Sequence, residues 1–190
     1  MKQWMWAIPV ALTVSACSAP APKNGLYVTY ERAGTLTMID ADTLESVGTL
    51  ELGKRPRGIV ASPDRTHVYV ALSGSPIAGP GVDESTLPPP DKGADGIGEV
   101  DLEARKLARI LRAGSDPEGI ALSKDGTQAF IANEDTGQVS FVHLADGVVT
   151  HSVKVGDEPE GITVSPDGQQ VWVTSEDAGA VYVVEIGRAH

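Results

Sequence analysis

Cysteine is almost absent from this chain, because Cys17 is the single one among 190 residues. One cysteine can form no disulfide within the chain and offers no pair for the attachment of a c-type haem. Histidine is also scarce, and no two of the four histidines have a ligand spacing on one element. The sequence therefore shows no ligand set for zinc, another transition metal or haem, and we expect no metal and no cofactor.

Basic residues are few as well. The chain has 15 Lys and Arg residues against 26 Asp and Glu residues, which gives a formal net charge of −11. An acidic surface repels phosphate backbones and anionic lipid headgroups, so we expect no nucleic-acid partner. The sequence also lacks a phosphate-binding loop, a hydrolase nucleophile elbow and a zinc-protease motif. We therefore predict no catalytic residue.

Long apolar runs are absent except near the N-terminus, where one extends from Trp4 to Val14 behind Lys2. This run is too short for a stable membrane span and is typical of an export signal. The residues Val14-Ser15-Ala16-Cys17 are similar to a bacterial lipobox, in which the cysteine is lipidated and becomes the mature N-terminus.

These features predict a lipoprotein signal peptide at residues 1–16 and a tether at residues 17–24. The protein is then expected in the periplasm of a Gram-negative bacterium, held to the membrane by a lipid on Cys17. By analogy with lipoproteins, Ser18 directly after the cysteine favours the outer membrane. A plain secretory signal with an incidental cysteine is the alternative.

One pattern recurs four times in the rest of the chain. A strand motif that starts with an aromatic residue begins at positions 27, 69, 130 and 172, so successive copies lie 42, 61 and 42 residues apart. A period near 42 is typical of propeller blades. The four copies are Tyr27-Val28-Thr29, Tyr69-Val70-Ala71, Phe130-Ile131-Ala132 and Trp172-Val173-Thr174.

A second motif repeats in the same register. It has the form x-Pro-x-Gly-Ile and begins at positions 55, 116 and 158, which are again 61 and 42 residues apart. Each copy leads into an apolar strand and a tight turn. The longer interval is therefore one repeat that carries an insertion of 19 residues. The copies are Arg55-Pro56-Arg57-Gly58-Ile59, Asp116-Pro117-Glu118-Gly119-Ile120 and Glu158-Pro159-Glu160-Gly161-Ile162.

The third repeat shows the predicted blade most plainly. Turns rich in Asp and Gly divide it into four strands, and such turns join antiparallel neighbours. The fold class is all-β: a partial β-propeller of about three to three and a half four-stranded antiparallel blades. The predicted strands of this repeat are residues 119–122, 128–132, 139–144 and 150–155.

Three of these motifs resemble the YVTN family of β-propeller repeats: Tyr27-Val28-Thr29, Pro159-Glu160-Gly161-Ile162 and Ser165-Pro166-Asp167-Gly168. The resemblance extends from Gly25 to Val184. The set of x-Pro-x-Gly motifs is similar to that of propeller proteins encoded beside genes for quinone (PQQ)-dependent alcohol catabolism. The resemblance implies a ring of about seven blades, of which residues 25–184 are an incomplete part.

The last six residues, 185–190, depart from the repeat. They also match a translation of the start of a common sequencing adapter. We therefore predict a non-native tail on an N-terminal fragment of a longer lipoprotein. A half-propeller that dimerises is the alternative.

One face of the propeller carries the candidate binding residues. The loop that enters the innermost strand and the loop between the second and third strands share this face. The insertion, at about residues 73–97, lies in one of these loops and is expected to cover the face, to contact a partner or to be a solvated excursion. The predicted ligand- or partner-binding residues are Arg55, Arg57, Asp116, Glu118, Glu158 and Glu160 in the entering loops, and Glu31, Glu134 and Glu176 in the other loops.

Other residues have structural interpretations. The acidic stretch 91–96 lacks the ligand spacing of a calcium loop. A serine recurs before each turn and is expected to hydrogen-bond the turn backbone. An aromatic residue recurs in each second strand and is expected to pack between blades. These are Ser62, Ser123 and Ser165, and Tyr69, Phe130 and Trp172.

The repeat and the export signal favour a non-catalytic, lipid-anchored periplasmic propeller. It would bind a protein partner as a scaffold or accessory, with a quinoprotein oxidation system as the expected context. Two alternatives remain open. One is an enzyme, since similar propellers include lactonases, amine dehydrogenase subunits and the haem d1 domain of nitrite reductase. The other is a cell-envelope surface or adhesion protein. Fold alone does not decide among them.

Overall fold

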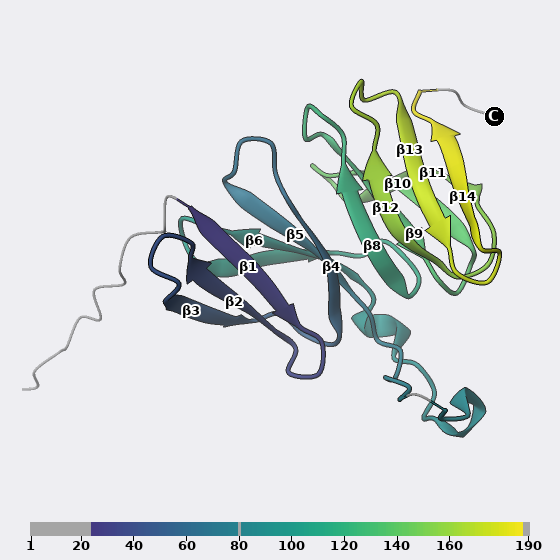
Figure 1. Cartoon of the computed structure of the whole chain (residues 1–190), viewed down its shortest axis with the longest axis horizontal. Helices are drawn as coiled ribbons and strands as arrows, with labels where there is room; N and C mark the ends of the chain where they lie inside the picture. The colour runs from purple at the N-terminus through teal and green to yellow at the C-terminus, as the bar shows by residue number, and fades with distance from the viewer. Residues whose placement is uncertain (1–23, 80, 188–190) are drawn as a thin grey trace, which may run out of the picture.

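The computed structural model describes residues 24–79 and 81–187 and consists of antiparallel strands with two short 3₁₀-helices. The strands form four separate sheets (Figure 1). The predicted signal peptide, the lipidation site Cys17 and the tether up to residue 23 lie outside the described residues. No helix of the described part is long and apolar enough to cross a membrane.

The first two sheets come from the N-terminal part of the chain. The first sheet has the order β1-β2-β3 and the second has the order β4-β5-β6-β7. Their strands are β1 (Gly25–Tyr30), β2 (Thr35–Asp40), β3 (Ser46–Glu51), β4 (Pro56–Ala61), β5 (His67–Leu72), β6 (Gly96–Asp101) and β7 (Lys106–Leu111).

The last two sheets follow the same plan. The third has the order β8-β9-β10-β11 and the fourth has the order β12-β13-β14. Their strands are β8 (Pro117–Leu122), β9 (Gln128–Asn133), β10 (Gln138–His143), β11 (Val148–Lys154), β12 (Pro159–Val164), β13 (Gln170–Ser175) and β14 (Ala180–Glu185). Glu185, the first residue of the predicted tail, thus continues a strand and pairs with Gln170.

The predicted blade is confirmed. The third sheet is an antiparallel meander whose four strands overlap the four predicted ranges. The recurrent aromatic residue is the third residue of β1, β5, β9 and β13. The recurrent serine also has its expected role, because Ser62 Oγ accepts a hydrogen bond from the backbone N–H of His67 at 3.0 Å. Ser123 and Ser165 make the same contact with Gln128 and Gln170.

Apolar clusters between successive sheets hold the fold together. Phe130 of β9 is fully buried and packs with Val171 and Val173 of the next sheet. Tyr69 of β5 packs in the same way with Ile120 and Ile131. Since burying a large apolar side chain stabilises by roughly 1.5–3 kcal/mol, these sheet-to-sheet contacts supply the core. The predicted packing of the aromatic residues between blades is therefore correct for these two.

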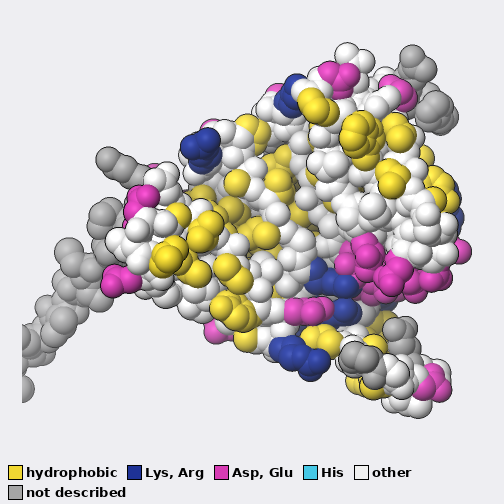
Figure 2. Space-filling view, viewed as in Figure 1, with side chains coloured by type: hydrophobic (Ala, Val, Ile, Leu, Met, Phe, Trp, Pro, Cys, Tyr) yellow, Lys and Arg dark blue, Asp and Glu magenta, His cyan; other side chains and the backbone are white. Residues whose placement is uncertain are grey.

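Among the described residues, the two flanking sheets have three strands each and the two inner sheets have four. The x-Pro-x-Gly motif that begins an innermost strand precedes β5, β9 and β13 but not β1. The first sheet therefore starts at the second-strand position. Its face carries Leu26 at 48% exposure, and Trp172 on the fourth sheet is 42% exposed. Figure 2 shows hydrophobic side chains gathered on the surface of both flanking sheets.

The insertion joins β5 to β6 and projects away from the sheets (Figure 1). It contains the 3₁₀-helices η1 (Glu84–Thr86) and η2 (Lys92–Ala94) and is otherwise irregular. Its return is fixed near η2, where the backbone N–H of Asp91 donates to the carbonyl of Gly74 at 2.9 Å. The middle of the insertion can therefore project into solvent while its two ends remain attached to the second sheet.

Candidate functional site: a charged face under the insertion

Two sets of loops meet on one face because the backbone joins them. The residue after the second strand donates its N–H to the carbonyl of the first residue of the x-Pro-x-Gly motif. These bonds run from Glu134 to Asp116 at 3.1 Å and from Glu176 to Glu158 at 3.0 Å. A longer bond of 3.3 Å runs from Ser73 to Arg55. The shared face predicted from the meander is therefore built by the same contact in three sheets.

The same motif residues have an unusual backbone conformation. Arg55, Asp116 and Glu158 have φ values of 40°, 48° and 48°. Positive φ is uncommon for residues other than glycine, and it recurs here directly before each proline. This repeated turn sets the direction in which each entering loop leaves for its innermost strand.

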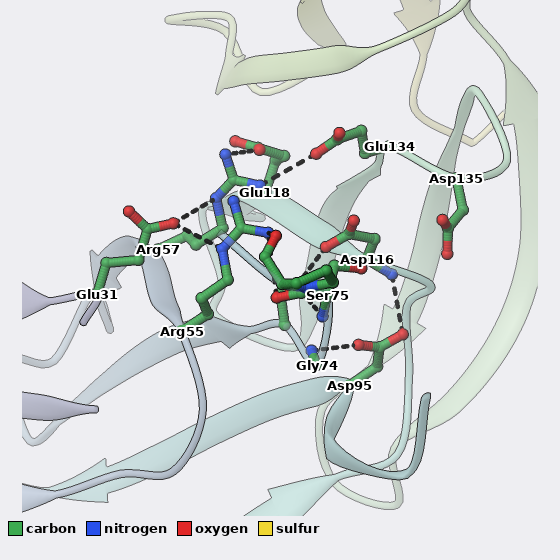
Figure 3. A network of polar contacts seen from close by, with 12 residues as sticks. Glu31, Arg55, Arg57, Gly74, Ser75, Asp95, Asp116, Glu118, Glu134 and Asp135 are labelled. Atoms are coloured by element: carbon green, nitrogen blue, oxygen red, sulfur yellow. Dashed lines mark hydrogen bonds and ion pairs between the residues drawn. The ribbon is translucent and has the colours of Figure 1, made fainter. Parts of the chain in front are cut away.

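Arg57 lies at the centre of the face (Figure 3). Its Nη1 donates to Glu134 Oε2 at 3.0 Å, its Nη2 pairs with Glu118, and its Nε lies 3.8 Å from Glu31 Oε1. Burial lowers the pKa of Arg57, and the neighbouring Arg55 lowers it further. Charge-assisted pairs of this kind have defined geometry, so Arg57 links the first, second and third sheets.

Arg55 connects the face to the insertion. Its Nε donates to Glu31 Oε1 at 2.7 Å, while its Nη1 donates to the carbonyls of Ser75 at 3.4 Å and Pro76 at 3.3 Å. The Arg55 side chain is 14% exposed. Because its donors are directed at Glu31 and at backbone carbonyls, Arg55 holds the start of the insertion in place.

Two buried carboxylates anchor the insertion from below (Figure 3). Asp95 Oδ1 accepts the N–H of Gly74 at 2.7 Å, and its Oδ2 accepts the N–H of Asp116 at 3.0 Å. The Ser73 hydroxyl donates to the carboxylate of Asp116. Asp95 and Asp116 are 6% and 4% exposed. Buried carboxylates need such partners, so these two have a structural role in holding the insertion.

Three glutamates of the fourth sheet have a different environment. Burial raises the pKa of Glu160, and a hydrogen bond and repulsion from Glu176 add to the rise. Burial also raises the pKa of Glu158, with repulsion from Asp177 and Glu134. Within the described ranges, the ion pairs of Lys and Arg go to other carboxylates. In the part of the chain that the structure describes, Glu158, Glu160 and Glu176 therefore form an acidic region in which no side chain is ion-paired with Lys or Arg.

The charged residues surround a cavity of about 460 Å³. Leu87 and the prolines 88–90 of the insertion form one wall. Acidic side chains gather beside Lys and Arg side chains above the insertion in Figure 2. A second cavity, of about 520 Å³, lies on the other side of Arg55 and includes Glu31 and Lys54.

The structure thus brings the predicted site residues together, with two differences in detail. Glu31 reaches Arg55 and Arg57 from the first sheet but lines the second cavity. Asp116 lines the first cavity although its carboxylate is engaged with Ser73. The predicted site residues that line the first cavity are Arg55, Arg57, Asp116, Glu118, Glu134, Glu158, Glu160 and Glu176.

Sequence reasoning missed the role of Asp95, which it considered only as part of the acidic stretch 91–96. The signal available was its place directly before β6, where a carboxylate can reach backbone N–H groups of the loop that leaves β5. No group of three or more His, Cys, Asp or Glu residues is arranged to hold a metal ion in the part of the chain that the structure describes.

No protein-family model and no curated protein matches this sequence. Solved structures do match its fold. A chain of Kuenenia stuttgartiensis hydrazine synthase matches with a TM-score of 0.55 and 14% identity over 80% of this chain and 52% of its own length. The dihydro-heme d1 dehydrogenase NirN, solved in complex with DHE, matches with a TM-score of 0.58 and 17% identity over 89% and 36%.

Both neighbours are β-propeller proteins, and this chain is a partial β-propeller. At these identities the likeness shows the fold alone. The chain spans about half the length of the one neighbour and about a third of the other. Their activities therefore do not transfer with the fold.

Proposed function

We propose that this chain belongs to a non-catalytic binding propeller that holds a protein partner on its charged face. The observation that carries the proposal is the cavity beneath the insertion, in which Arg57 forms ion pairs with Glu118 and Glu134, whereas Glu158, Glu160 and Glu176 form none with a Lys or Arg of the described residues. A basic group of a partner would complete this surface. Complementary charge of this kind favours specificity and fast association.

The shape of the face supports binding. The loops are tied by repeated backbone bonds, and the insertion adds an apolar wall of Leu87 and prolines 88–90 next to the carboxylates. A rigid surface loses little conformational entropy when a partner docks. Loops placed on a rigid scaffold are a common position for binding residues.

The cellular setting is part of the proposal. The YVTN-like repeats and their x-Pro-x-Gly motifs support membership in the family of propellers encoded beside PQQ-dependent oxidation genes. The leader and Cys17 support a lipoprotein in the periplasm, on the outer membrane. Labelling with a radioactive fatty acid tests the anchor: Cys17→Ala should abolish incorporation, and incorporation that persists would contradict it.

The partner is expected to be a quinoprotein dehydrogenase or transporter component encoded next to this chain. The test is co-purification of the full chain with that component, together with the activity of the dehydrogenase. Glu160→Gln/Glu176→Gln should reduce capture, whereas Glu103→Gln, an exposed turn residue outside the cavity, should not. The proposal fails if the wild-type chain neither binds the component nor changes its activity.

Catalysis is the second candidate, and the raised pKa of Glu160 near Arg57 is the observation that favours it. Perturbed carboxyl groups in a cavity are typical of general acids and bases. Arg57 would polarise a lactone carbonyl while a glutamate positions the water. Lactone hydrolysis by the purified chain that Arg57→Ala abolishes would establish this candidate, and its absence with a panel of lactones would remove it.

A further inference from the structure

The repeat places the same pair of glutamates in two successive sheets. Glu118 is the second residue of β8, and Glu160 is the second residue of β12. Glu134 directly follows β9, and Glu176 directly follows β13. Both pairs are joined to the same backbone turn by an equivalent N–H to carbonyl bond. The two pairs thus occupy equivalent positions in successive repeats, 42 residues apart.

The first pair holds a guanidinium group. Glu118 and Glu134 bind the two terminal nitrogens of Arg57, which extends toward them from the preceding sheet. The Arg57 side chain is 19% exposed and that of Glu118 is 11% exposed. Two carboxylates on separate nitrogens of one planar guanidinium form a specific arrangement that a point charge does not reproduce.

The second pair has no such group. Arg57 is the second residue of β4, and the equivalent residue of the next sheet is Glu118. The position that would supply a cation to Glu160 and Glu176 is therefore taken by Glu118, whose carboxylate is already paired with Arg57. Glu160 and Glu176 instead line the same cavity, where their like charges repel each other.

We propose that Glu160 and Glu176 bind a guanidinium group from outside the chain, as Glu118 and Glu134 bind Arg57. The ligand is an arginine side chain of the partner protein, so this inference rests on the proposed binding function and names the group that is recognised. The occupied pair one sheet earlier is the template for the geometry.

The cavity has room for the rest of that side chain. Its volume of about 460 Å³ lies within the range of small-ligand sites. Leu87 and prolines 88–90 offer an apolar wall on which the methylene groups of arginine can lie while the charged end reaches the carboxylates. Lysine lacks the planar fork and should bind more weakly.

Isothermal titration calorimetry of the full chain with N-acetyl-arginine amide tests the proposal. N-acetyl-citrulline amide is the neutral isostere, and N-acetyl-lysine amide tests the geometry. We expect one arginine probe per chain and at least tenfold weaker binding of citrulline. Glu160→Gln/Glu176→Gln should weaken arginine binding at least tenfold, and Glu103→Gln should leave it unchanged. Equal binding of citrulline, or full binding by the double variant, would overturn the proposal.

A gain of binding gives a second test. Arg57→Ala frees Glu118 and Glu134, so the number of arginine probes bound per chain should rise from one to two. Circular dichroism identifies a variant that has unfolded, in which case Arg57→Gln replaces it. A folded variant that still binds a single probe would contradict the equivalence of the two pairs.

The two proposals can fail separately. If the dehydrogenase binds the wild-type chain and the Glu160→Gln/Glu176→Gln variant equally, the guanidinium site is wrong and the accessory function stands. If the arginine probe binds but the dehydrogenase does not, the site stands and the proposed partner is wrong.

Discussion

The inner sheets and the flanking sheets carry the same kinds of residue in opposite environments. Phe130 in the third sheet is 0% exposed, whereas Trp172 at the equivalent position of the fourth is 42% exposed. Val70 in the second sheet is 0% exposed, and its equivalent Val28 in the first is 38% exposed. The strand pattern decides which face of a strand is apolar, but a neighbouring sheet decides whether that face is buried.

The largest expected effect comes from the aromatic pair. Phe130→Ala should cost about 3–5 kcal/mol of unfolding free energy, because it leaves a cavity between the third and fourth sheets. Trp172→Ala should cost no more than about 1 kcal/mol, since its ring is already half in solvent. Urea denaturation of both variants measures the difference. Equal losses would show that Trp172 is covered in solution.

The insertion allows a comparison between an anchored and a projecting segment. Asp95→Ala leaves the N–H groups of Gly74 and Asp116 without their acceptor and should cost about 1–3 kcal/mol. The start of the insertion should then be cleaved faster in limited proteolysis. Asp83→Ala, in the projecting part, removes a local turn contact with Ser85 and serves as the control. Unchanged cleavage after Asp95→Ala would mean that the other contacts, such as those of Arg55 and of the Asp91 backbone N–H, hold the insertion without Asp95.

The fourth sheet should respond to pH in a distinctive way. The pKa of Glu160 is raised above its ordinary value of 4.5, so the folded chain binds its proton more tightly than the unfolded chain does. Stability should therefore fall as pH rises from 4.5 through the raised folded-state pKa. Glu160→Gln should flatten this decline in urea denaturation at a series of pH values. A decline of the same size in the variant would assign it to other groups.

The smallest effect on stability is expected at the exposed turns. There the pH dependence has the opposite sign to that of Glu160, because stability falls as pH falls. Hydrogen bonds from Ser62 and Thr66 lower the pKa of Asp64 from 3.8 to about 2. The unfolded chain therefore binds this proton more tightly, and the contribution to stability is lost as pH falls from 3.8 toward 2. Asp64→Asn should make the acid side of the profile shallower while leaving the side above pH 5 unchanged. NMR titration of the Asp64 carboxyl checks the pKa directly.

The repeat allowed most of the fold to be predicted. The spacing of Tyr27, Tyr69, Phe130 and Trp172 located one strand in every sheet, namely β1, β5, β9 and β13, because each strand position recurs with the blade. The x-Pro-x-Gly motifs located the innermost strands for the same reason. The sequence also indicates that the first sheet begins at the second-strand position, since no such motif precedes β1.

The candidate site was predicted only in part. The positions of the loops were enough to predict that Arg57, Glu118 and Glu134 lie on one face, because the meander determines which loops are neighbours. Which side chain pairs with which depends on reach across sheets, and the burial of Asp95 and Asp116 depends on how the insertion folds back. Neither follows from a repeat, because an insertion has no equivalent elsewhere in the chain.

The backbone bond that joins the two loops in three of the sheets affects how such a face can change over evolution. Glu134 and Glu176 are tied through their backbone N–H groups, and a backbone hydrogen bond can form with any side chain except that of proline. Charge at these positions can be exchanged, as Ser73 at the equivalent place already shows. The loop backbone of the face can therefore stay the same while its side chains change. A new partner can then be bound by substitutions on the face without a change of fold.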